Sequence, residues 1–287
     1  MKIIQDFMQI YMYELEKFLE TKKNELKMVS FQSDEANTDR PLKEFLKLLI
    51  ETSFSTIPEK CEITEIQFEG VNSTDITVLK TLKINRVLLP EDITEEIREM
   101  IKESKSSVYT NPDMCLEIIF DNKVYYETIE LKSTKQDSIP GSSIQQILPT
   151  EWVIFIKHSN NKIEVTTGQY IHAINSKMQF PDRSPRPQVS FKEMMNWNQL
   201  NRLIQYSSLV YKKDENEQTK YELIHDWQSV LAERWIEMLF EANTVKNNEP
   251  WFNNNMRKFI LDFLERYEAL SETEKIEFKD KIKNLIK

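Results

Sequence analysis

The sequence predicts an α+β protein in which a central mixed β-sheet is wrapped by N- and C-terminal helices. Apolar residues recur at helical spacing near both ends of the 287-residue chain, which is typical of amphipathic helices. Between residues 114 and 167, β-branched and aromatic residues concentrate, and turn sequences such as Asp121-Asn122-Lys123 interrupt them, which is typical of strands. Because 40% of the residues are hydrophobic, the chain can bury a substantial core.

The N-terminal region is expected to begin with two helices. Residues 1–27 carry an apolar stripe at helical spacing, and residues 42–54 repeat the pattern before Pro58 ends it. The first stripe consists of Ile4, Met8, Tyr11, Leu15 and Phe18. A polar stretch at residues 30–40 separates the two helices. Short β-favouring segments follow at residues 63–68 and 84–89, around the turn-like sequence Asn72-Ser73-Thr74.

The middle of the chain is expected to form the sheet. Asp92 follows Pro90 in an acidic stretch and is expected to cap a helix that runs to about Ser106. Strands are predicted at residues 114–132, 152–157 and 162–167. A short helix is expected at residues 142–148, opened by Pro140-Gly141 and closed by Pro149.

Apolar residues return to helical spacing from Phe191 onward. The residues that carry this pattern are Met195, Trp197, Leu200, Leu203, Leu223, Trp227, Leu231 and Trp235. Two more helices are predicted, one at residues 256–267 and one after Ser271, which forms a capping box with Glu274. The chain therefore divides into a mixed region at residues 1–90, a sheet region at 91–190 and a helical region at 191–287, or combines them in one compact domain.

The composition excludes several classes of protein. The three glycines, Gly70, Gly141 and Gly168, lie too far apart for a dinucleotide-binding or P-loop motif, since both place several glycines around a phosphate. The two cysteines, Cys61 and Cys115, provide neither a disulfide framework nor a zinc knuckle. No apolar run approaches the roughly 20 residues that span a bilayer, and no signal-peptide cleavage site follows the N-terminus. We therefore expect a cytoplasmic protein without a membrane partner.

A candidate catalytic motif begins at Pro112-Asp113. Glu130-Leu131-Lys132 starts 17 residues after this aspartate, so the pattern reads PD-x16-ExK. The pattern alone is weak, because an acidic residue two positions before a lysine also occurs at Asp121 and Lys123 and at several helical positions, and a second Pro-Asp stands at residues 181–182. Its structural context has to decide.

The predicted hairpin supplies that context. With Asn122-Lys123 as a two-residue turn, Asp113 faces Lys132, and the side chains alternate between two faces. One face is apolar and interrupted only by Glu127; it carries Met114, Leu116, Ile118, Phe120, Tyr125, Ile129 and Leu131. The opposite face gathers Asp113, Glu117, Glu130 and Lys132 near the open end of the hairpin.

Two carboxylates and an ammonium on adjacent strands suit Mg²⁺, a hard ion that takes one or two protein carboxylates and keeps water ligands. The metal would polarise a phosphoryl oxygen and lower the pKa of a bound water, and the lysine would orient that water and offset transition-state charge. This chemistry predicts phosphodiester hydrolysis. The alternative is a surface ion pair of Lys132 with one carboxylate, worth at most about 1 kcal/mol. Glu117 is either a further ligand or a bystander.

Asp113, Glu130 and Lys132, in a hairpin between an upstream helix and a downstream helix and strand, resemble the motif of the PD-(D/E)xK nuclease superfamily, and most of all that of type II restriction endonucleases. The core of that family is helix, β-meander, helix and strand. Residues 92–106, 114–132, 142–148 and 152–157 fill these positions in order. The resemblance thus implies a restriction-endonuclease-like nuclease core within residues 91–190. One departure is that the strand expected before Asp113 is only residues 108–110.

The resemblance also implies roles for single residues. Asp113 and Glu130 would bind Mg²⁺, with the Leu131 carbonyl as an additional ligand, and Lys132 would position the attacking water. It implies hydrolysis of double-stranded DNA at a specific sequence, products with a 5′-phosphate, and a homodimer that cuts both strands of a palindrome. A cognate DNA methyltransferase is expected in the same system, although not as a stable partner.

An acidic chain needs a local basic surface to hold DNA. The net charge is -9, but residues 151–213 carry nine Lys and Arg residues against four acidic ones, a local +5. The proline-rich loop at residues 180–187 offers Arg183 and Arg186, whose guanidinium groups suit guanine or phosphate. We expect these arginines and Lys157 to contact DNA. The alternatives are an exposed connecting loop and a solvated strand end.

Two other functions stay open at this point. One is a repair or structure-specific nuclease with the same chemistry. The other is a helical interaction protein that uses the sheet as a scaffold and catalyses nothing.

Overall fold

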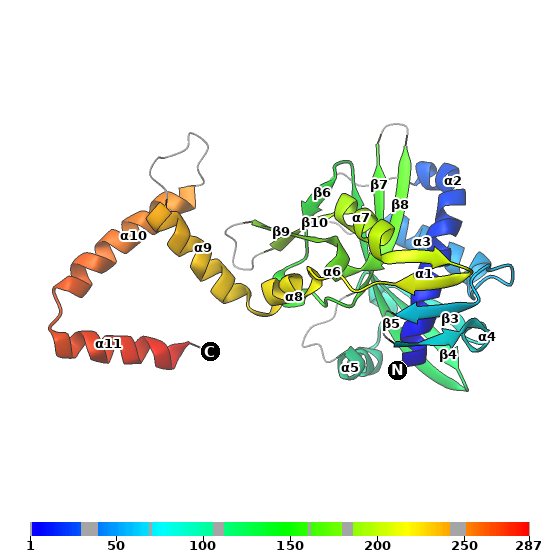
Figure 1. Cartoon of the computed structure of the whole chain (residues 1–287), viewed down its shortest axis with the longest axis horizontal. Coiled ribbons are helices and arrows are strands. Elements are labelled where there is room, and N and C mark those ends of the chain that lie inside the picture. The colour runs from blue at the N-terminus through cyan, green and yellow to red at the C-terminus, as the bar shows by residue number, and fades with distance from the viewer. Residues whose placement is uncertain are drawn as a thin grey trace. The chain divides into compact units, whose positions relative to one another are not determined.

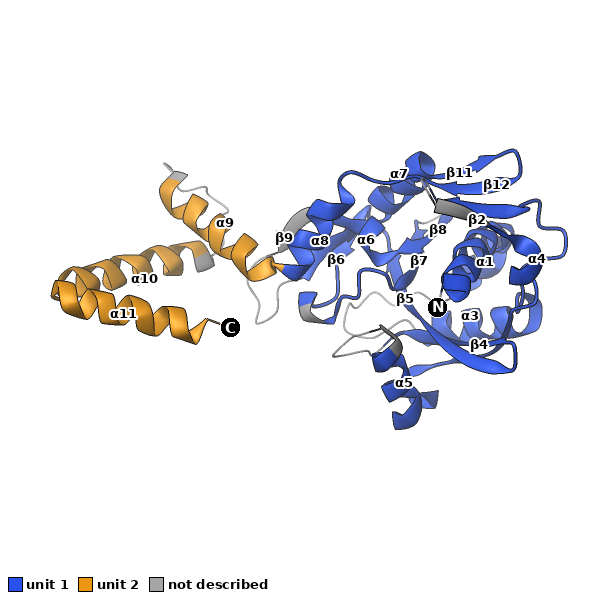
Figure 2. Ribbon diagram, turned by 60° about the horizontal axis from the view of Figure 1, so that its bottom comes forward, with its two compact units in different colours: residues 1–225 blue, residues 226–287 orange. Residues whose placement is uncertain are grey.

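The computed structural model describes residues 2–29, 40–68, 71–105, 112–159, 162–179, 186–241 and 251–286. The chain forms two compact units, residues 1–225 and residues 226–287 (Figure 2). Both expected boundaries, at residues 90 and 190, fall inside the first unit. Helices and mixed sheets occur together, so the predicted α+β class is confirmed.

A five-stranded mixed sheet forms the centre of the first unit (Figure 1). Its spatial order is β3 (Lys83–Leu88), β4 (Met114–Phe120), β5 (Lys123–Thr134), β7 (Trp152–His158) and β8 (Ile163–Gln169). Neighbouring strands are antiparallel except β5 and β7, which run parallel. The connection between β5 and β7 therefore has to cross from one end of the sheet to the other.

Helices pack on both faces of this sheet because each face carries buried apolar residues. The helices α1 (Lys2–Thr21) and α3 (Arg40–Ser53) contribute to the same buried cluster as Leu116, Ile129 and Ile154 of the sheet. On the other face, α5 (Glu95–Lys105) places Ile97 and Ile101 against Leu88 and Cys115. The alternation predicted for residues 114–132 thus separates two covered faces of the hairpin.

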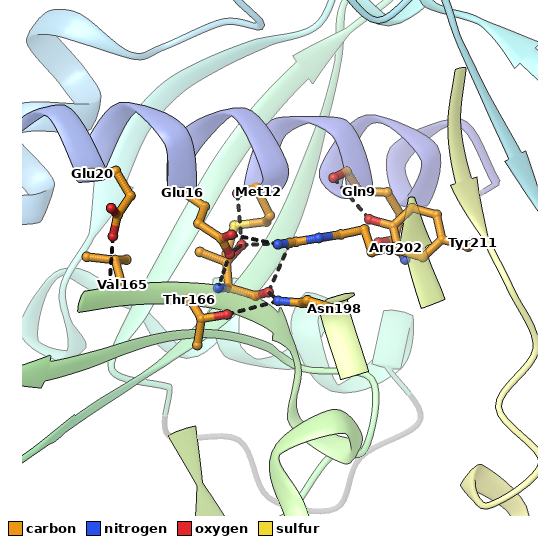
Figure 3. Close-up of polar contacts among 10 residues, drawn as sticks. Gln9, Met12, Glu16, Glu20, Val165, Thr166, Asn198, Arg202 and Tyr211 are labelled. Atoms are coloured by element: carbon orange, nitrogen blue, oxygen red, sulfur yellow. Dashed lines mark hydrogen bonds and ion pairs between the residues drawn. The ribbon is translucent and has the colours of Figure 1, made fainter. Parts of the chain in front are cut away.

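Helix α1 also protects the edge of the sheet, because β8 is an outer strand. The backbone N–H groups of Thr167 and Val165 donate to Glu16 Oε2 at 2.6 Å and to Glu20 Oε1 at 3.1 Å (Figure 3). The two acceptors on α1 are four helical residues apart, which is about 6 Å, and the two donors on β8 are two strand residues apart, which is about 6.7 Å. The two distances match, so both hydrogen bonds can form at once. Arg202 completes this contact with a 2.7 Å ion pair to Glu16.

Two smaller sheets complete the first unit. One has the order β11 (Arg202–Gln205), β12 (Ser208–Tyr211), β1 (Glu65–Phe68) and β2 (Val71–Asp75), and the other has the order β6 (Ser138–Pro140), β10 (Arg186–Ser190) and β9 (Ile174–Gln179). The remaining helices of this unit are α2 (Lys23–Met28), α4 (Ile76–Leu79), α6 (Tyr170–Ala173), α7 (Phe191–Asn201) and α8 (Glu217–His225), with 3-10 turns η1 (Pro90–Asp92) and η2 (Ile144–Gln146). The C-terminal unit consists of α9 (Trp227–Glu241), α10 (Trp251–Glu268) and α11 (Glu272–Leu285).

Several local predictions were wrong. Asp92 does not cap α5; it accepts a hydrogen bond from the Leu89 N–H at 3.1 Å, and Thr94 Oγ1 accepts from Ile97 N–H at the start of the helix. The expected helix at residues 142–148 is only the 3-10 turn η2. Residues 72–74, expected as a turn, belong to β2. The helical pattern through Leu203 ends at Asn201, because β11 and β12 form a hairpin there.

Other local predictions were confirmed. Helices occupy the two N-terminal segments, and the Ser271 and Glu274 capping box begins α11. The strand expected at residues 108–110 lies outside the described residues. No helix among the described residues is long and apolar enough to cross a membrane.

Candidate functional site

The β4–β5 hairpin brings the motif residues together with a register that differs from the predicted one. Phe120 pairs with Lys123, so the turn is Asp121-Asn122 and not Asn122-Lys123. Both turn residues have positive φ, 48° and 57°, as a two-residue type I′ turn requires, and Asp and Asn tolerate that conformation. Continuing the observed register places Asp113 opposite Glu130 rather than Lys132. The slip is two residues, so every side chain keeps its predicted face.

Glu130, Lys132 and Ser142 form one hydrogen-bonded triangle. Lys132 Nζ lies 2.6 Å from Glu130 Oε1, and it donates to Ser142 Oγ at 3.3 Å. The Ser142 hydroxyl in turn donates to Glu130 Oε1 at 2.9 Å. Tyr170 supports the triangle, since its hydroxyl accepts from the Ser142 N–H at 2.9 Å and its ring lies under the ammonium, 5.9 Å from its centroid. The lysine of the motif is therefore held in a fixed position.

The charge state of Lys132 follows from these neighbours. Burial by itself lowers the pKa of Lys132, but the nearby Glu130, Tyr170 and Asp113 outweigh burial and hold the pKa above its usual value. Lys132 is a cation at neutral pH. It can donate hydrogen bonds and offset negative charge, but it cannot accept a proton.

Asp113 lies at the start of β4, buried between two donors. Its Oδ1 is 2.7 Å from Lys43 Nζ of α3, and its Oδ2 accepts from the Leu131 N–H at 2.8 Å. Both side chains of this ion pair are nearly inaccessible, with 6% of Lys43 and 11% of Asp113 exposed. The second bond ties Asp113 to the residue between Glu130 and Lys132.

A third carboxylate, Glu151, belongs to the same cluster. In the parallel pairing of β5 with β7, Glu130 lies beside Val153, so Glu151 precedes β7 on the same face as Thr128 and Glu130. Burial raises the pKa of Glu151 to about 8, with Glu130 and Asp113 adding to the rise and the Thr128 hydroxyl and Lys132 opposing it. Three carboxylates from adjacent strands thus share one buried region with two lysines.

The side chains of this cluster offer oxygen donors, the kind of ligand that a hard divalent cation takes. Asp113 and Glu130 offer carboxylate oxygens beside the Leu131 backbone, and oxygen ligands are those that Mg²⁺ prefers. Among the described residues, no three His, Cys, Asp or Glu side chains are gathered closely enough to hold a metal by themselves. Lys43 and the Leu131 N–H contact the two Asp113 oxygens, and Lys132 and Ser142 contact Glu130 Oε1, so a cation bound there would have to share or displace these partners.

Glu117 stands apart from this cluster. Its carboxylate lies 2.8 Å from Arg86 Nη2 and accepts hydrogen bonds from Asn85 at 2.6 Å and Tyr126 at 3.3 Å. Arg86, followed by Asn85, lowers the pKa of Glu117 against the opposing effect of burial. Glu117 therefore serves as the partner of Arg86 on β3.

The predicted DNA-contacting residues have different environments. Arg186 begins β10 and is exposed, whereas Arg183 lies outside the described residues. Lys157 stands on β7 two residues after Phe155, the residue that pairs with Lys132, and it forms an ion pair with Asp137. Arg202, which contributed to the basic count of this region, is buried against Glu16.

The segment that carries Ser142 is tied to β10. The Gly141 N–H donates to the Pro187 carbonyl at 2.8 Å, directly after Arg186 in the chain. A Cβ atom on Gly141 would lie 2.6 Å from that carbonyl oxygen and 2.7 Å from the Tyr170 hydroxyl. Only glycine fits this position, and it connects the strand of Arg186 to the triangle around Lys132.

A cavity of about 240 Å³ opens beside the first part of β5. Its lining includes Glu127 and Thr150, which directly precede Thr128 and Glu151 in the chain, together with Trp152 and Gln169. β7 begins opposite Ile129, so the earlier part of β5 has no neighbour on this side within the five-stranded sheet. The cavity occupies that step in the sheet.

Sequence reasoning missed Lys43, Ser142, Glu151 and Tyr170. A signal for Lys43 existed, because it stands three and seven positions before Leu46 and Ile50, on the buried stripe of α3. A lysine on such a stripe indicates a buried partner. Glu151 directly precedes the apolar run of β7, but only the strand register brings it to Glu130.

Comparisons of the chain with protein-family models, with curated proteins and with solved structures found no significant match.

Proposed function

We propose that this protein is a Mg²⁺-dependent deoxyribonuclease, specifically a type II site-specific endonuclease that hydrolyses phosphodiester bonds of double-stranded DNA. The observation that carries the proposal is the placement of Asp113 and Glu130 around Leu131, with Lys132 held as a cation 2.6 Å from Glu130. The order of hairpin, crossover and parallel strand supports a restriction-endonuclease-like core. The connection departs from that pattern in having a 3-10 turn where a helix was expected.

In this proposal each residue has one task. Asp113 and Glu130 would hold Mg²⁺, which when bound polarises a phosphoryl oxygen and acidifies a water ligand. Lys132 would orient the attacking water by a hydrogen bond and offset the charge that develops on the phosphoryl oxygens. Ser142 and Tyr170 would hold Lys132 in place. Attack of the water oxygen on phosphorus breaks the bond to the 3′ oxygen and leaves a 5′-phosphate.

The same proposal includes the DNA and protein partners. Arg183, Arg186 and Lys157 would contact the duplex, and the bond from Gly141 to Pro187 would link the strand of Arg186 to the site. A homodimer would place one site on each DNA strand. The protein would act in the cytoplasm beside a methyltransferase that modifies the same sequence.

DNA cleavage by matched variants tests this function. Wild-type protein, Glu130→Gln and Lys132→Gln are incubated with several phage DNAs and Mg²⁺, with and without EDTA. We expect wild type to give discrete fragments that EDTA abolishes, and each variant to cut at least about 100-fold more slowly, because charge stabilisation and water positioning are each worth that much. Circular dichroism shows that the variants are folded.

The control is Asp121→Asn with Lys123→Gln, which removes the same acidic-x-Lys pattern from the exposed end of the same hairpin. This double variant should cut like wild type. Discrete fragments from intact duplex exclude a structure-specific repair nuclease. Absence of cutting by wild type on every DNA, with Mg²⁺ or Mn²⁺, would contradict the proposal and favour a non-catalytic interaction protein.

A further inference from the structure

The C-terminal unit leaves an unusual amount of apolar surface uncovered. No residue of α11 is buried. Seven large apolar side chains of α10, α11 and the residue after α11 are each between 43% and 72% exposed: Phe259, Leu261, Leu264, Ile276, Ile282, Leu285 and Ile286. Exposed apolar residues are ordinary one at a time, but such a concentration on two helices marks an interaction surface.

The two helices form a hairpin that closes only near its turn. Phe278 of α11 packs against Phe263 and Tyr267 of α10, with ring centroids 6.0 Å and 6.2 Å apart. Lys275 and Lys279 lie over the Tyr267 ring. Away from this turn the helices diverge (Figure 1), and Phe259, Leu285 and Ile286 remain exposed towards the open end. Two helices of this length bury too little of each other to account for their apolar residues.

The charges of the hairpin are separated along its length. The turn end, residues 262–279, carries six acidic residues against three basic ones, a net charge of −3. The open end, residues 251–261 and 280–286, carries four basic residues against one acidic one, a net charge of +3. Two hairpins laid antiparallel would place each acidic end on the basic end of the other.

We infer that the α10–α11 hairpin is a self-association surface, and that its partner is the same hairpin of a second copy, packed antiparallel. A two-fold axis brings a surface onto itself, and the charge pattern is complementary under that operation. Four helices in this arrangement form a bundle whose core takes up apolar residues that each hairpin leaves exposed. This self-association would account for the proposed homodimer. It does not depend on DNA binding or on catalysis by the protein.

Two variants of the full-length chain test the antiparallel arrangement. Each variant reverses the charge of one end of the α10–α11 hairpin and leaves the other end unchanged. The acidic-end variant carries Glu265→Lys, Glu268→Lys and Glu277→Lys, and the basic-end variant carries Lys258→Glu, Lys281→Glu and Lys283→Glu. Oligomeric state is measured by sedimentation equilibrium in EDTA, where nuclease activity plays no part. We expect wild type to be a dimer and each variant to dimerise at least tenfold more weakly, because like charges then face each other.

The decisive measurement is the equimolar mixture of the two variants. In an antiparallel dimer every end of one variant meets an opposite charge on the other, so the mixture should recover a heterodimer of wild-type stability. The chain that combines all six substitutions should again form a homodimer.

An apolar pair of variants tests the core of the surface. Leu285→Ser with Ile286→Ser should weaken the dimer, whereas Leu200→Ser, at an exposed leucine of the first unit, should not. A monomeric wild type at high micromolar concentration, single-end variants as dimeric as wild type, or a mixture that stays monomeric would each overturn the inference. So would a monomer whose basic end binds DNA and loses that binding in the basic-end variant. None of these results bears on whether DNA cleavage depends on Glu130 and Lys132, because the nuclease assay measures that separately.

Discussion

Lys43 and Asp113 form an ion pair, 2.7 Å apart, that connects α3 to the aspartate of the candidate motif. The pair is buried, and Asp113 also accepts the Leu131 N–H. Lys43 therefore fixes the orientation of a carboxylate whose other neighbours lie in the sheet. It neutralises one of three carboxylates in the cluster, and this is a condition for burying them together.

Removing this ammonium should destabilise the fold. Lys43→Met keeps most of the side-chain length but leaves Asp113 buried without its cation, so we expect a loss of about 3–5 kcal/mol in the free energy of unfolding. Urea unfolding followed by circular dichroism measures it. The control is Lys47→Met, one turn later on α3, where the ion pair with Asp92 is partly exposed and worth at most about 1 kcal/mol. Equal losses in the two variants would contradict a special role for the buried pair.

Gly141 gives a second prediction, because its Cβ would meet the Pro187 carbonyl and the Tyr170 hydroxyl at less than van der Waals distance. Gly141→Ala should push β10 or Tyr170 away from Ser142, at a cost of about 1–3 kcal/mol, and reduce DNA cleavage by displacing Lys132. Gly168→Ala is the control, since the nearest atoms to its Cβ lie 3.5 Å away in ordinary contact. Thermal unfolding of both variants checks the stability, and a destabilised Gly168→Ala with an unaffected Gly141→Ala would refute the packing argument.

The hairpin illustrates how far sequence reasoning reaches. The enrichment in β-branched and aromatic residues at 114–132 predicted the two strands, and the period of two along a strand predicted the face of every residue, because both depend on local sequence. The turn was placed one position too late, at Asn122-Lys123, because Asp121 at positive φ was not anticipated. The resulting slip of two residues preserves the faces, so the grouping of Asp113, Glu130 and Lys132 on one face survived the error.

The unpredicted parts depend on contacts between distant segments. Lys43 meets Asp113 across 70 positions of sequence, and Glu151 reaches the cluster through the parallel register of β5 and β7. The helical pattern was predicted to continue through Leu203, into β11, because short apolar runs fit either period. The hairpin of β11 and β12 was not predicted. Strand β12 pairs with β1, which lies more than 130 residues earlier in the chain. No local sequence pattern can predict a pairing over that distance.

Glu151 predicts that stability falls as the pH rises. Its pKa is raised by burial to about 8 in the folded protein, against 4.5 for an ordinary glutamate. The folded state therefore holds a proton that the unfolded state has lost, so this contribution is complete below about pH 4.5 and disappears as the pH passes 8. Glu151→Gln should remove this pH dependence and be more stable than wild type at pH 9. Urea unfolding between pH 5 and pH 9 measures it, with the exposed Glu193→Gln as control; parallel curves for Glu151→Gln and wild type would refute the assignment.

His172 predicts the opposite dependence at lower pH. Its ring is stacked on Trp197 with centroids 3.3 Å apart, and its Nδ1 is buried without a hydrogen-bond partner among the residues that the structure describes. Burial, followed by the charges of Lys220 and Arg202, holds the pKa of His172 well below its usual 6.5. In this case the unfolded state binds the extra proton, so stability is complete above about pH 6.5 and declines as the pH falls towards the folded-state pKa. His172→Phe keeps an aromatic ring beside Trp197 but cannot titrate, so its stability should fall less than that of wild type between pH 7 and pH 5. His225→Asn, at an exposed histidine, should follow the wild-type curve, and a wild-type slope in His172→Phe would show that other groups cause the acid sensitivity.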